Sequence, residues 1–292
     1  MQDQDITRFR VTHRLRVRWA EVDLQGVVFN GHYLTYIDSA LTEYWRVMGL
    51  PYDTIPARFD GAEMYVKKST LEYHGSARYE DLLDVGGRCA RIGNSSMTFQ
   101  GGIFRDDRLL VLGELVYVMA DPATRRSRPL PGALRDMLES FEAGHSPVEI
   151  VLGSWSELGT QAAPLRREVL MNELGIADPM DQDGADGAAL HVLVRNRMGL
   201  AVATARLLQE GPGRARISRL CVTHALRGAG FGRQAVQALL QRSRARGDTC
   251  VLVQAARHAQ GFYAGFGFEA VGAPYEQAGI RHVDLALTLA PH

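Results

Sequence analysis

The residues with the clearest potential for chemistry lie in one loop, AEVDLQGVVFNG, ahead of a long helical pattern. Asp23 stands seven residues before Asn30, where that helix is expected to begin. A helix N-terminus presents unpaired N–H groups and positive partial charge, so it can stabilise the oxyanion that forms when a carbonyl is attacked. A carboxylate opposite can act as the base for water or as the nucleophile. An aspartate that only caps a turn is the alternative that this loop alone leaves open.

A glycine-rich turn in the C-terminal half is the second feature. It reads Arg227-Gly228-Ala229-Gly230-Phe231-Gly232 and lies between an apolar strand pattern and a helical one. Successive amides at such a turn, together with the helix dipole, can hold a pyrophosphate. The turn lacks the Gly-Lys-Ser/Thr of a P-loop and the full G-x-G-x-x-G of a dinucleotide site. By itself it is also consistent with an ordinary tight turn.

The elements that position Asp23 form an α+β pattern. Residues 11–19 alternate as in a strand, and residues 32–48 carry apolar side chains at steps of three and four, as in an amphipathic helix. Four strand-like segments follow as a predicted meander, at residues 63–74, 82–93, 95–105 and 109–120. A long, mostly apolar helix wrapped by a curved antiparallel sheet buries most of its surface.

The glycine turn belongs to a different arrangement, of mixed α/β type. The pattern predicts helices at residues 160–174, 233–246 and 259–265, and strands at residues 188–194, 199–208, 215–222, 249–255, 269–272 and 282–287. An acidic loop is expected at 178–187. Between the two halves, Gly144 and Pro147 follow a short helix at residues 133–142, which places the domain boundary near residue 146. We therefore expect domains at residues 1–146 and 147–292.

Composition narrows the classes of partner. The 292 residues fit two domains, and 33 Lys+Arg balance 33 Asp+Glu, which argues against nucleic acid and anionic membranes as partners. No apolar run approaches the ~20 residues of a membrane span, and the start lacks the apolar core of a signal peptide. Cys89, Cys221 and Cys250 show no metal-like spacing. These features predict a cytoplasmic protein without a metal site.

The loop and helix together resemble a known signature. The stretch WAEVDLQGVVFNGHYLTYID is similar to the D-x-x-G-V-V motif of the 4-hydroxybenzoyl-CoA thioesterase family of hotdog-fold proteins, and the resemblance continues to about Pro131. It implies hydrolysis of acyl-CoA at a subunit interface, in a homodimer or homotetramer. Asp23 takes the place of the catalytic aspartate, and the amide of Asn30 or Gly31 that of the oxyanion donor. Some members carry histidine at the position of Asn30, so the resemblance does not imply a histidine-assisted mechanism here.

The second half resembles the GNAT acetyltransferase superfamily, in its ElaA-like branch, from about Glu149 to Leu287. The motifs are R-x-x-G-x-G after ISRLCV, and GFYAGFGFEAVG downstream. The resemblance implies that Tyr263 protonates the departing CoA thiolate, while the pantetheine arm lies along a strand edge and the pyrophosphate lies on the glycine turn. The implied acetyl-CoA site consists of Leu220, Cys221, Val222, Arg227, Gly228, Ala229, Gly230, Phe231, Gly232 and Arg233.

The transfer also requires a base for the amine. Glu173, His191 and His282 are the candidates, by resemblance only. The combined prediction is a bifunctional enzyme that hydrolyses acyl-CoA and acetylates an amine, with CoA thioesters as substrates and no tightly bound cofactor. Alternatively, one domain is catalytic and the other is an oligomerisation scaffold or a CoA-binding regulatory module. The sequence names neither the acyl chain nor the amine.

Overall fold

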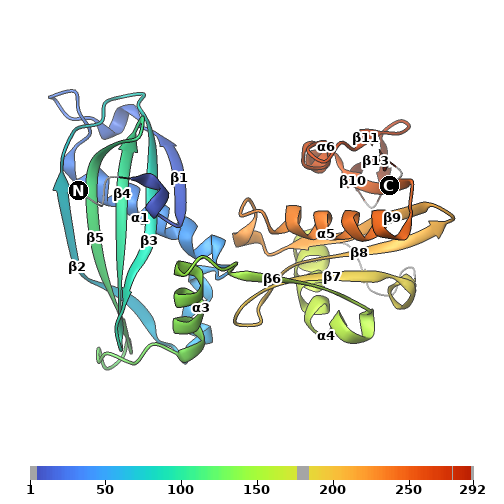
Figure 1. Cartoon of the computed structure of the whole chain (residues 1–292), viewed down its shortest axis with the longest axis horizontal. Coiled ribbons are helices and arrows are strands. Elements are labelled where there is room, and N and C mark those ends of the chain that lie inside the picture. Colours follow the sequence, from blue (N-terminus) through green and yellow to red (C-terminus); the bar gives the residue numbers. More distant parts are fainter. Residues whose placement is uncertain (1–4, 176–183, 278, 291–292) are drawn as a thin grey trace. The chain divides into compact units, whose positions relative to one another are not determined.

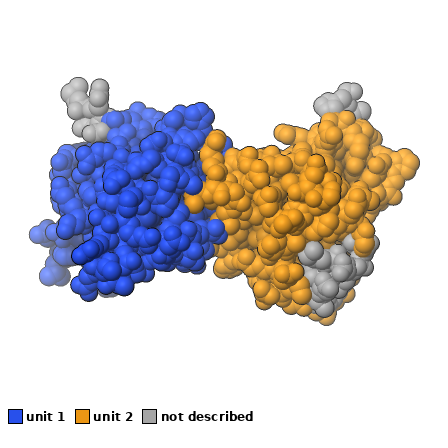
Figure 2. Space-filling model, turned by 90° about the horizontal axis from the view of Figure 1, so that it is seen from below, with its two compact units in different colours: residues 1–147 blue, residues 148–292 orange. Residues whose placement is uncertain are grey.

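The structure, a computed structural model, describes residues 5–175, 184–277 and 279–290. The chain divides into two compact units, Met1–Pro147 and Val148–His292 (Figure 2). Each unit has its own sheet and its own buried core. Within the described residues, none of the helices combines the length and apolar composition that a membrane span requires.

The first unit is a five-stranded antiparallel sheet around a central helix (Figure 1). The strand order is β1-β3-β4-β5-β2. The strands are β1 (Val11–Arg16), β2 (Glu63–Tyr73), β3 (Leu82–Ile92), β4 (Ser96–Arg105) and β5 (Arg108–Ala120). The helices are α1 (Asn30–Val47), α2 (Ile55–Arg58) and α3 (Gly132–Glu142). This is the hotdog arrangement that the sequence predicts.

Helix α1 packs on the sheet because glycines leave room for it. Its buried side chains recur at steps of three and four along the helix. Gly101 of β4 and Gly113 of β5 face each other in register. A Cβ on either residue would lie 2.4 Å from the side chain of Ile37. The two glycines therefore allow the helix to approach the sheet closely, and this contact holds the helix N-terminus in place.

Two details of the first unit differ from the sequence prediction. The four later strands do not form a simple meander, because β2 pairs with β5 at the far edge while β1 pairs with β3. Strand β1 ends at Arg16, before Trp19, which lies in a 3-10 turn and is 76% exposed. Alternation of apolar residues predicts which residues share a face, but not which strands are neighbours.

The second unit is a mixed sheet with the order β11-β13-β10-β9-β8-β7-β6. Its strands are β6 (Val148–Gly153), β7 (Leu190–Asn196), β8 (Ala201–Gly211), β9 (Arg214–Val222), β10 (Cys250–Ala256), β11 (Glu269–Ala270), β12 (Tyr275–Gln277) and β13 (Ile280–Thr288). Helices α4 (Trp155–Arg166) and α5 (Phe231–Arg246) cover opposite faces, and the short α6 (Gln260–Ala264) follows β10 (Figure 1). This confirms the mixed α/β class.

Two strands, β6 and β12, are not predicted from the sequence. β6 pairs along its whole length with β7, and β12 pairs antiparallel with β13. The predicted helix at 160–174 also begins earlier, at Trp155, where Ser154 and Glu157 form a capping box. Most of the predicted acidic loop, residues 176–183, lies outside the described residues.

Candidate active sites

The loop that carries Asp23 is a closed hairpin. Val22 and Val28 form a β-bridge, and the Asp23 N–H donates to the Val27 carbonyl at 2.9 Å. The Asp23 carboxylate is half-buried and accepts from the Gln25 N–H at 2.8 Å. The Phe29 N–H also donates to the Glu21 carbonyl, so the hairpin fixes the path of the chain between Asp23 and Asn30.

Glu21 fixes this loop to the helix. Its carboxylate accepts from the Arg18 side chain at 2.8 Å and from the Tyr36 hydroxyl at 2.8 Å, and its carbonyl accepts from the Phe29 N–H at 2.9 Å. Burial by itself raises the pKa of the Glu21 carboxyl, but the hydrogen bonds from Arg18 and Tyr36 outweigh it and hold the pKa below its ordinary value. Sequence reasoning missed Glu21, although its place two residues before Asp23 was a usable signal.

The first turn of α1 has backbone amides without an intrahelical acceptor. The helix begins at Asn30, and Asn30 and Gly31 are both exposed. The Tyr73 hydroxyl donates to the Asn30 carbonyl at 3.2 Å and so ties the turn to β2. The arrangement therefore provides a carboxylate and a pair of free amides, which is what attack on a carbonyl requires.

Two aromatic residues near this turn have packing contacts. Tyr33 is buried, and its hydroxyl accepts from the Ala77 N–H at 2.9 Å. The His32 ring packs edge-on against Phe29, with ring centroids 6.0 Å apart. Tyr73, which sequence reasoning did not single out, contacts both Asn30 and the Tyr33 ring.

In the second unit, the candidate site is a cleft where two parallel strands separate. β9 and β10 pair only from Cys250 with Arg214 to Val253 with Ile217. In the part of the chain that the structure describes, β9 therefore has no partner strand on its β10 side over residues 218–222, and the Val222 carbonyl accepts from Arg227 Nε at 3.3 Å. A cleft of about 680 Å³ opens here, and Leu220 and Tyr263 both line it. An open strand edge can pair with an extended ligand that carries amides.

A bulge in β9 shapes the cleft. The pairing with β8 shifts by one residue between Arg206 with Ser218 and Thr204 with Cys221. Arg219 within this bulge has a φ of 55°, in the left-handed region. The Cys221 thiol is buried, and burial raises its pKa to about 12. Cys221 thus contributes backbone and packing to the site rather than a reactive thiolate.

The glycine turn offers fewer free amides than its length suggests. Gly228 and Gly230 have φ angles of 89° and 92°, which favour glycine, and Gly230 is the N-cap of α5. The Arg227 and Ala229 amides donate within the turn, to the carbonyls of His224 and Leu226. Among the residues that the structure describes, the amides of Gly228, Gly230, Phe231 and Gly232 have no backbone acceptor, so they can bind an anion at the helix N-terminus. The exposed Arg233 guanidinium lies over the Phe266 ring at 5.0 Å.

Arg227 and Glu173 form a bidentate ion pair. The guanidinium donates to both carboxylate oxygens, at 2.5 and 2.6 Å. The hydrogen bond from Arg227 lowers the pKa of the Glu173 carboxyl. A carboxylate of lowered pKa is a poor proton acceptor for an ammonium group, so the geometry favours a structural role for Glu173.

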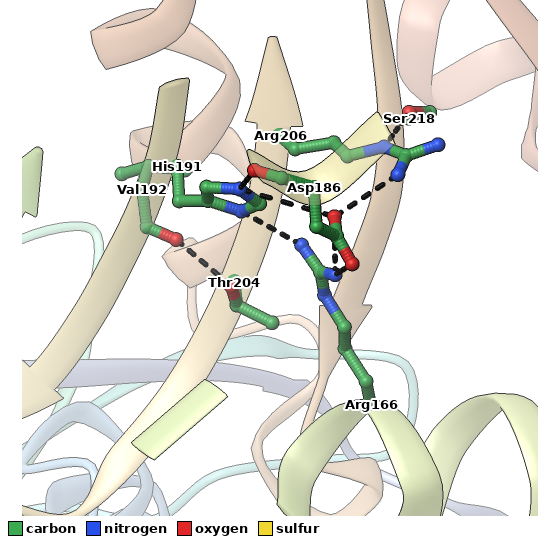
Figure 3. Close-up of polar contacts among 7 residues, drawn as sticks. All are labelled: Arg166, Asp186, His191, Val192, Thr204, Arg206 and Ser218. Carbon is green, nitrogen blue, oxygen red and sulfur yellow. Dashed lines mark hydrogen bonds and ion pairs between the residues drawn. The ribbon is translucent and has the colours of Figure 1, made fainter. Parts of the chain in front are cut away.

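His191 belongs to a buried polar cluster rather than to the cleft (Figure 3). Its Nδ1 accepts from Arg166 at 2.9 Å, and its Nε2 donates to the Asp186 carbonyl at 2.9 Å. The Asp186 carboxylate accepts from both Arg166 and Arg206 at 2.9 Å. Burial lowers the pKa of His191. With both ring nitrogens engaged, His191 has no free lone pair for a proton, so the structure argues against it as the base.

His282 is the base candidate that lies at the cleft. It lines the same cleft as Tyr263. Its Nδ1 is 2.9 Å from the Ile280 carbonyl and acts as donor there, which leaves Nε2 as acceptor. Burial raises the pKa of the Tyr263 hydroxyl above its ordinary value, so Tyr263 holds its proton at neutral pH. The cleft thus contains a proton acceptor and a proton donor.

Comparison with known proteins bears on both sites. The family described as "Thioesterase superfamily" matches residues 25–112, and the family described as "Acetyltransferase (GNAT) domain" matches residues 175–289. A UPF0039 protein of Synechocystis sp. is 35% identical over 131 residues, which are 44% of this chain and 84% of that protein. Each of the two families therefore matches within one unit of the chain. The predicted hotdog thioesterase and GNAT resemblances are confirmed.

Two further relatives resemble the thioesterase unit. The acyl-CoA thioester hydrolase YbgC of Escherichia coli O6:H1 is 27% identical over 121 residues, 41% of this chain and 89% of that protein. A thioesterase of Thermus thermophilus, solved with coenzyme A and zinc, is 24% identical with a TM-score of 0.41. It covers 47% of this chain and 97% of that chain. In this protein, no group of three metal-ligating side chains is found among the described residues.

Proposed function

We propose that the chain is a bifunctional acyl-CoA enzyme. In this proposal residues 1–146 form a thioesterase domain and residues 147–292 form a GNAT N-acetyltransferase domain. The observation that supports it best is that each family match coincides with a unit that carries its own candidate site. CoA thioesters are the shared substrates, and no tightly bound cofactor is required. The free thiols of Cys89, Cys221 and Cys250 are consistent with a reducing cytoplasm.

In the thioesterase domain, Asp23 acts on the thioester as base or as nucleophile. As a base, it removes a proton from water while the water oxygen attacks the carbonyl carbon. The amides of Asn30 and Gly31 stabilise the oxyanion. When the intermediate collapses, the carbon–sulfur bond breaks and the CoA thiolate takes the proton from Asp23. The products are the free acid and CoA.

In the acetyltransferase domain, His282 removes a proton from the ammonium form of the substrate, which leaves a nucleophilic amine. The amine attacks the acetyl carbonyl, the carbon–sulfur bond then breaks, and the nitrogen loses its second proton to solvent as the amide forms. Tyr263 donates its proton to the CoA thiolate and is reprotonated from solvent. Leu220, Cys221 and Val222 present the open strand edge to pantetheine. The free amides at Gly228, Gly230, Phe231 and Gly232 hold the pyrophosphate, while Arg227, through its pair with Glu173, supports the turn.

The first unit assembles as a homodimer or homotetramer in this proposal. Three large apolar side chains beside the Asp23 loop are exposed: Trp19 at 76%, Leu24 fully, and Phe29 at 53%. Apolar groups gathered around a site are typical of a surface that another chain covers. Light scattering on the full chain should therefore give at least twice the mass of one chain, and a strict monomer would contradict this part of the proposal.

The experiment that tests the function is thiol release from a panel of acyl-CoAs, with and without amines. Release without amine measures hydrolysis, and the amine-dependent increase with acetyl-CoA measures transfer. We expect both. Release that depends entirely on amine would make the first unit a scaffold, and release that no amine changes would make the second unit a CoA-binding module.

A further inference from the structure

We propose that the Ser218 hydroxyl donates a hydrogen bond to the acetyl oxygen in the cleft of the second unit and stabilises the oxyanion of the transfer. The proposal rests on the proposed acetyltransferase function. Ser218 lies on β9 and lines the cleft of about 680 Å³ that Tyr263 and His282 also line. It is the first residue of β9 beyond the pairing with β10, which ends at Ile217 with Val253.

The Ser218 hydroxyl has a fixed direction because Arg206 donates to it. The Arg206 Nε lies 2.9 Å from the Ser218 Oγ (Figure 3). A guanidinium has donors and no acceptor, so the Ser218 oxygen is the acceptor of this bond. Its own proton therefore points elsewhere, and within the described residues no group accepts it. Donation from a cation also polarises a hydroxyl and strengthens the bond that the hydroxyl donates in turn.

Arg206 is itself held by the Asp186 carboxylate, to which its Nη1 donates at 2.9 Å. Both residues are buried, Arg206 at 2% exposure and Asp186 at 7%. The same carboxylate accepts from Arg166 at 2.9 Å, and the Asp186 carbonyl lies 2.9 Å from the His191 Nε2 (Figure 3). Arg206 and Asp186 are therefore positioning residues, which act on the reaction through the direction of the Ser218 hydroxyl.

The length of CoA brings the acetyl group to Ser218. The pyrophosphate end of the site adjoins the end of β9, because a Cβ on Gly232 would lie 3.2 Å from the Val222 side chain. From Val222 back to Ser218 the strand advances about 13 Å, at about 3.3 Å per residue. The pantetheine arm spans about 13 bonds from phosphorus to sulfur, or roughly 16 Å at about 1.2 Å per bond in an extended chain. Pantetheine that follows this edge therefore ends beside Ser218, and the pairing of Ile217 with Val253 closes the edge beyond.

The backbone next to Ser218 is strained, as expected of a functional position. Arg219 has a φ of 55°, in the left-handed region. Residues other than glycine are strained there and cluster at functional sites. The bulge that contains Arg219 begins after the pair of Ser218 with Arg206, and a bulge bends the strand that carries it. Ser218 thus keeps its partner on β8 at the point where β9 leaves β10.

The proposed role of Ser218 transfers no proton. When the amine attacks, the acetyl oxygen becomes negative, and a fixed donor stabilises this oxyanion more than the neutral carbonyl. In the proposed mechanism His282 and Tyr263 move protons, and neither of them holds the oxyanion. Ser218 is therefore a catalytic residue that lowers the barrier to attack and leaves the binding of acetyl-CoA unchanged.

The test compares Ser218→Thr with Ser218→Val, which have the same shape and differ in the hydroxyl. In the full chain, the kcat of acetyl transfer should be about 100-fold lower in Ser218→Val, the effect of losing one oxyanion donor. The Kd of acetyl-CoA and the hydrolysis of acyl-CoA by the first unit should be equal in the two variants. Thr204→Val is the control, because it removes a buried hydroxyl of β8 that does not line the cleft. Equal kcat values in Ser218→Thr and Ser218→Val would overturn the proposal.

A double-mutant cycle tests the positioning residues. Asp186→Asn should lower kcat about tenfold in the original chain and should have no further effect in Ser218→Val, because its effect passes through the hydroxyl. An equal loss in both backgrounds would overturn the positioning role of Asp186. If Asp186→Asn does not fold, Arg206→Lys replaces it in the cycle, because lysine keeps the charge but lacks the planar fork that places Nε.

A binding measurement separates this inference from the proposed function. Infrared spectroscopy of bound acetyl-CoA with a ¹³C-labelled carbonyl needs no transfer, and a hydrogen bond to a carbonyl oxygen lowers its stretching frequency. Both variants carry Asp23→Asn to slow hydrolysis, and the signal of the first unit cancels between them. We expect a lower frequency in Ser218→Thr than in Ser218→Val, and equal frequencies would overturn the contact. A difference in a chain that transfers no acetyl group would keep the contact and overturn only the acetyltransferase assignment.

Discussion

In the proposed function, the two units act on the same kind of ligand with different parts of the chain. In the thioesterase unit, side chains build the site: Glu21, Tyr36 and Tyr73 hold the Asp23 loop and the first turn of α1 in place. In the acetyltransferase unit, the backbone builds it, through the separation of β9 from β10, the bulge at Arg219 and the left-handed glycines of the turn. Where side chains hold a site together, single substitutions at several positions should lower its activity. Where the backbone forms the site, activity should fall mainly when a side chain that transfers a proton or contacts the substrate is replaced.

The largest expected effect is at Asp23. Asp23→Asn removes the group that takes the proton from water, so hydrolysis of acyl-CoA should fall by about 10²–10⁴-fold. Acetyl transfer should not change, because the other unit contains its own site. Thiol release measured with and without amine reports both activities. Asp107→Asn, in the β4–β5 turn, is the control. If hydrolysis by Asp23→Asn equalled that of the control, Asp23 would have no catalytic role.

The next effect is at Tyr263. Tyr263→Phe removes the proton donor but keeps the ring that packs against Phe262 and Phe268. We expect acetyl transfer to fall by about 100-fold, with the Kd of acetyl-CoA within twofold of the original. A transfer assay measures the rate, and calorimetry measures the Kd of acetyl-CoA. Full transfer activity in Tyr263→Phe would show that water protonates the thiolate.

A substitution of Glu21 tests whether its hydrogen bonds hold the Asp23 loop in place. Glu21→Gln loses the charge-assisted bond from Arg18 and should lower the free energy of unfolding by about 1–3 kcal/mol at pH 7. Because the folded-state pKa of Glu21 is lowered, its contribution is present above the unfolded-state pKa of about 4.3 and is lost as the pH falls through the folded-state value. The stability difference between the two proteins should therefore shrink below about pH 4.

Denaturant titration at several pH values measures this difference. Glu43→Gln, which breaks the half-buried Glu43–Arg46 pair on the same unit, is the control and should cost about 0–1 kcal/mol. A pH-independent loss in Glu21→Gln would mean that the ionised carboxylate is not what stabilises the loop.

The smallest effect should be at Glu173. Its ion pair with Arg227 is partly exposed, and pairs of this kind contribute about 0–1 kcal/mol. Glu173→Gln should therefore leave acetyl transfer within about fivefold and leave the pH profile of kcat unshifted. His282→Gln, by comparison, should lower acetyl transfer by about 10²–10⁴-fold. A loss of that size in Glu173→Gln would exchange the roles of the two residues.

The elements that the sequence predicts well are those with a strong local pattern. Helix α1 begins two residues before the predicted start and ends one residue before the predicted end, because its apolar spacing and the Gly49 stop are both local. Strands β2 to β5 lie within one or two residues of their predicted positions. The sequence does not predict β6 and β12, because short strands of this kind are stabilised by pairing with another strand, β7 or β13, and not by a pattern of their own.

The candidate sites also combine residues that local motifs predict with residues that only long-range contacts bring together. Local motifs in the sequence predict that Asp23 precedes a helix, that glycines open α5 and that each half resembles one family. Contacts between distant segments are what enclose His191 with Arg166 and Asp186 and place His282 at the cleft. The pairing of distant strands sets such contacts, and no local pattern encodes that pairing.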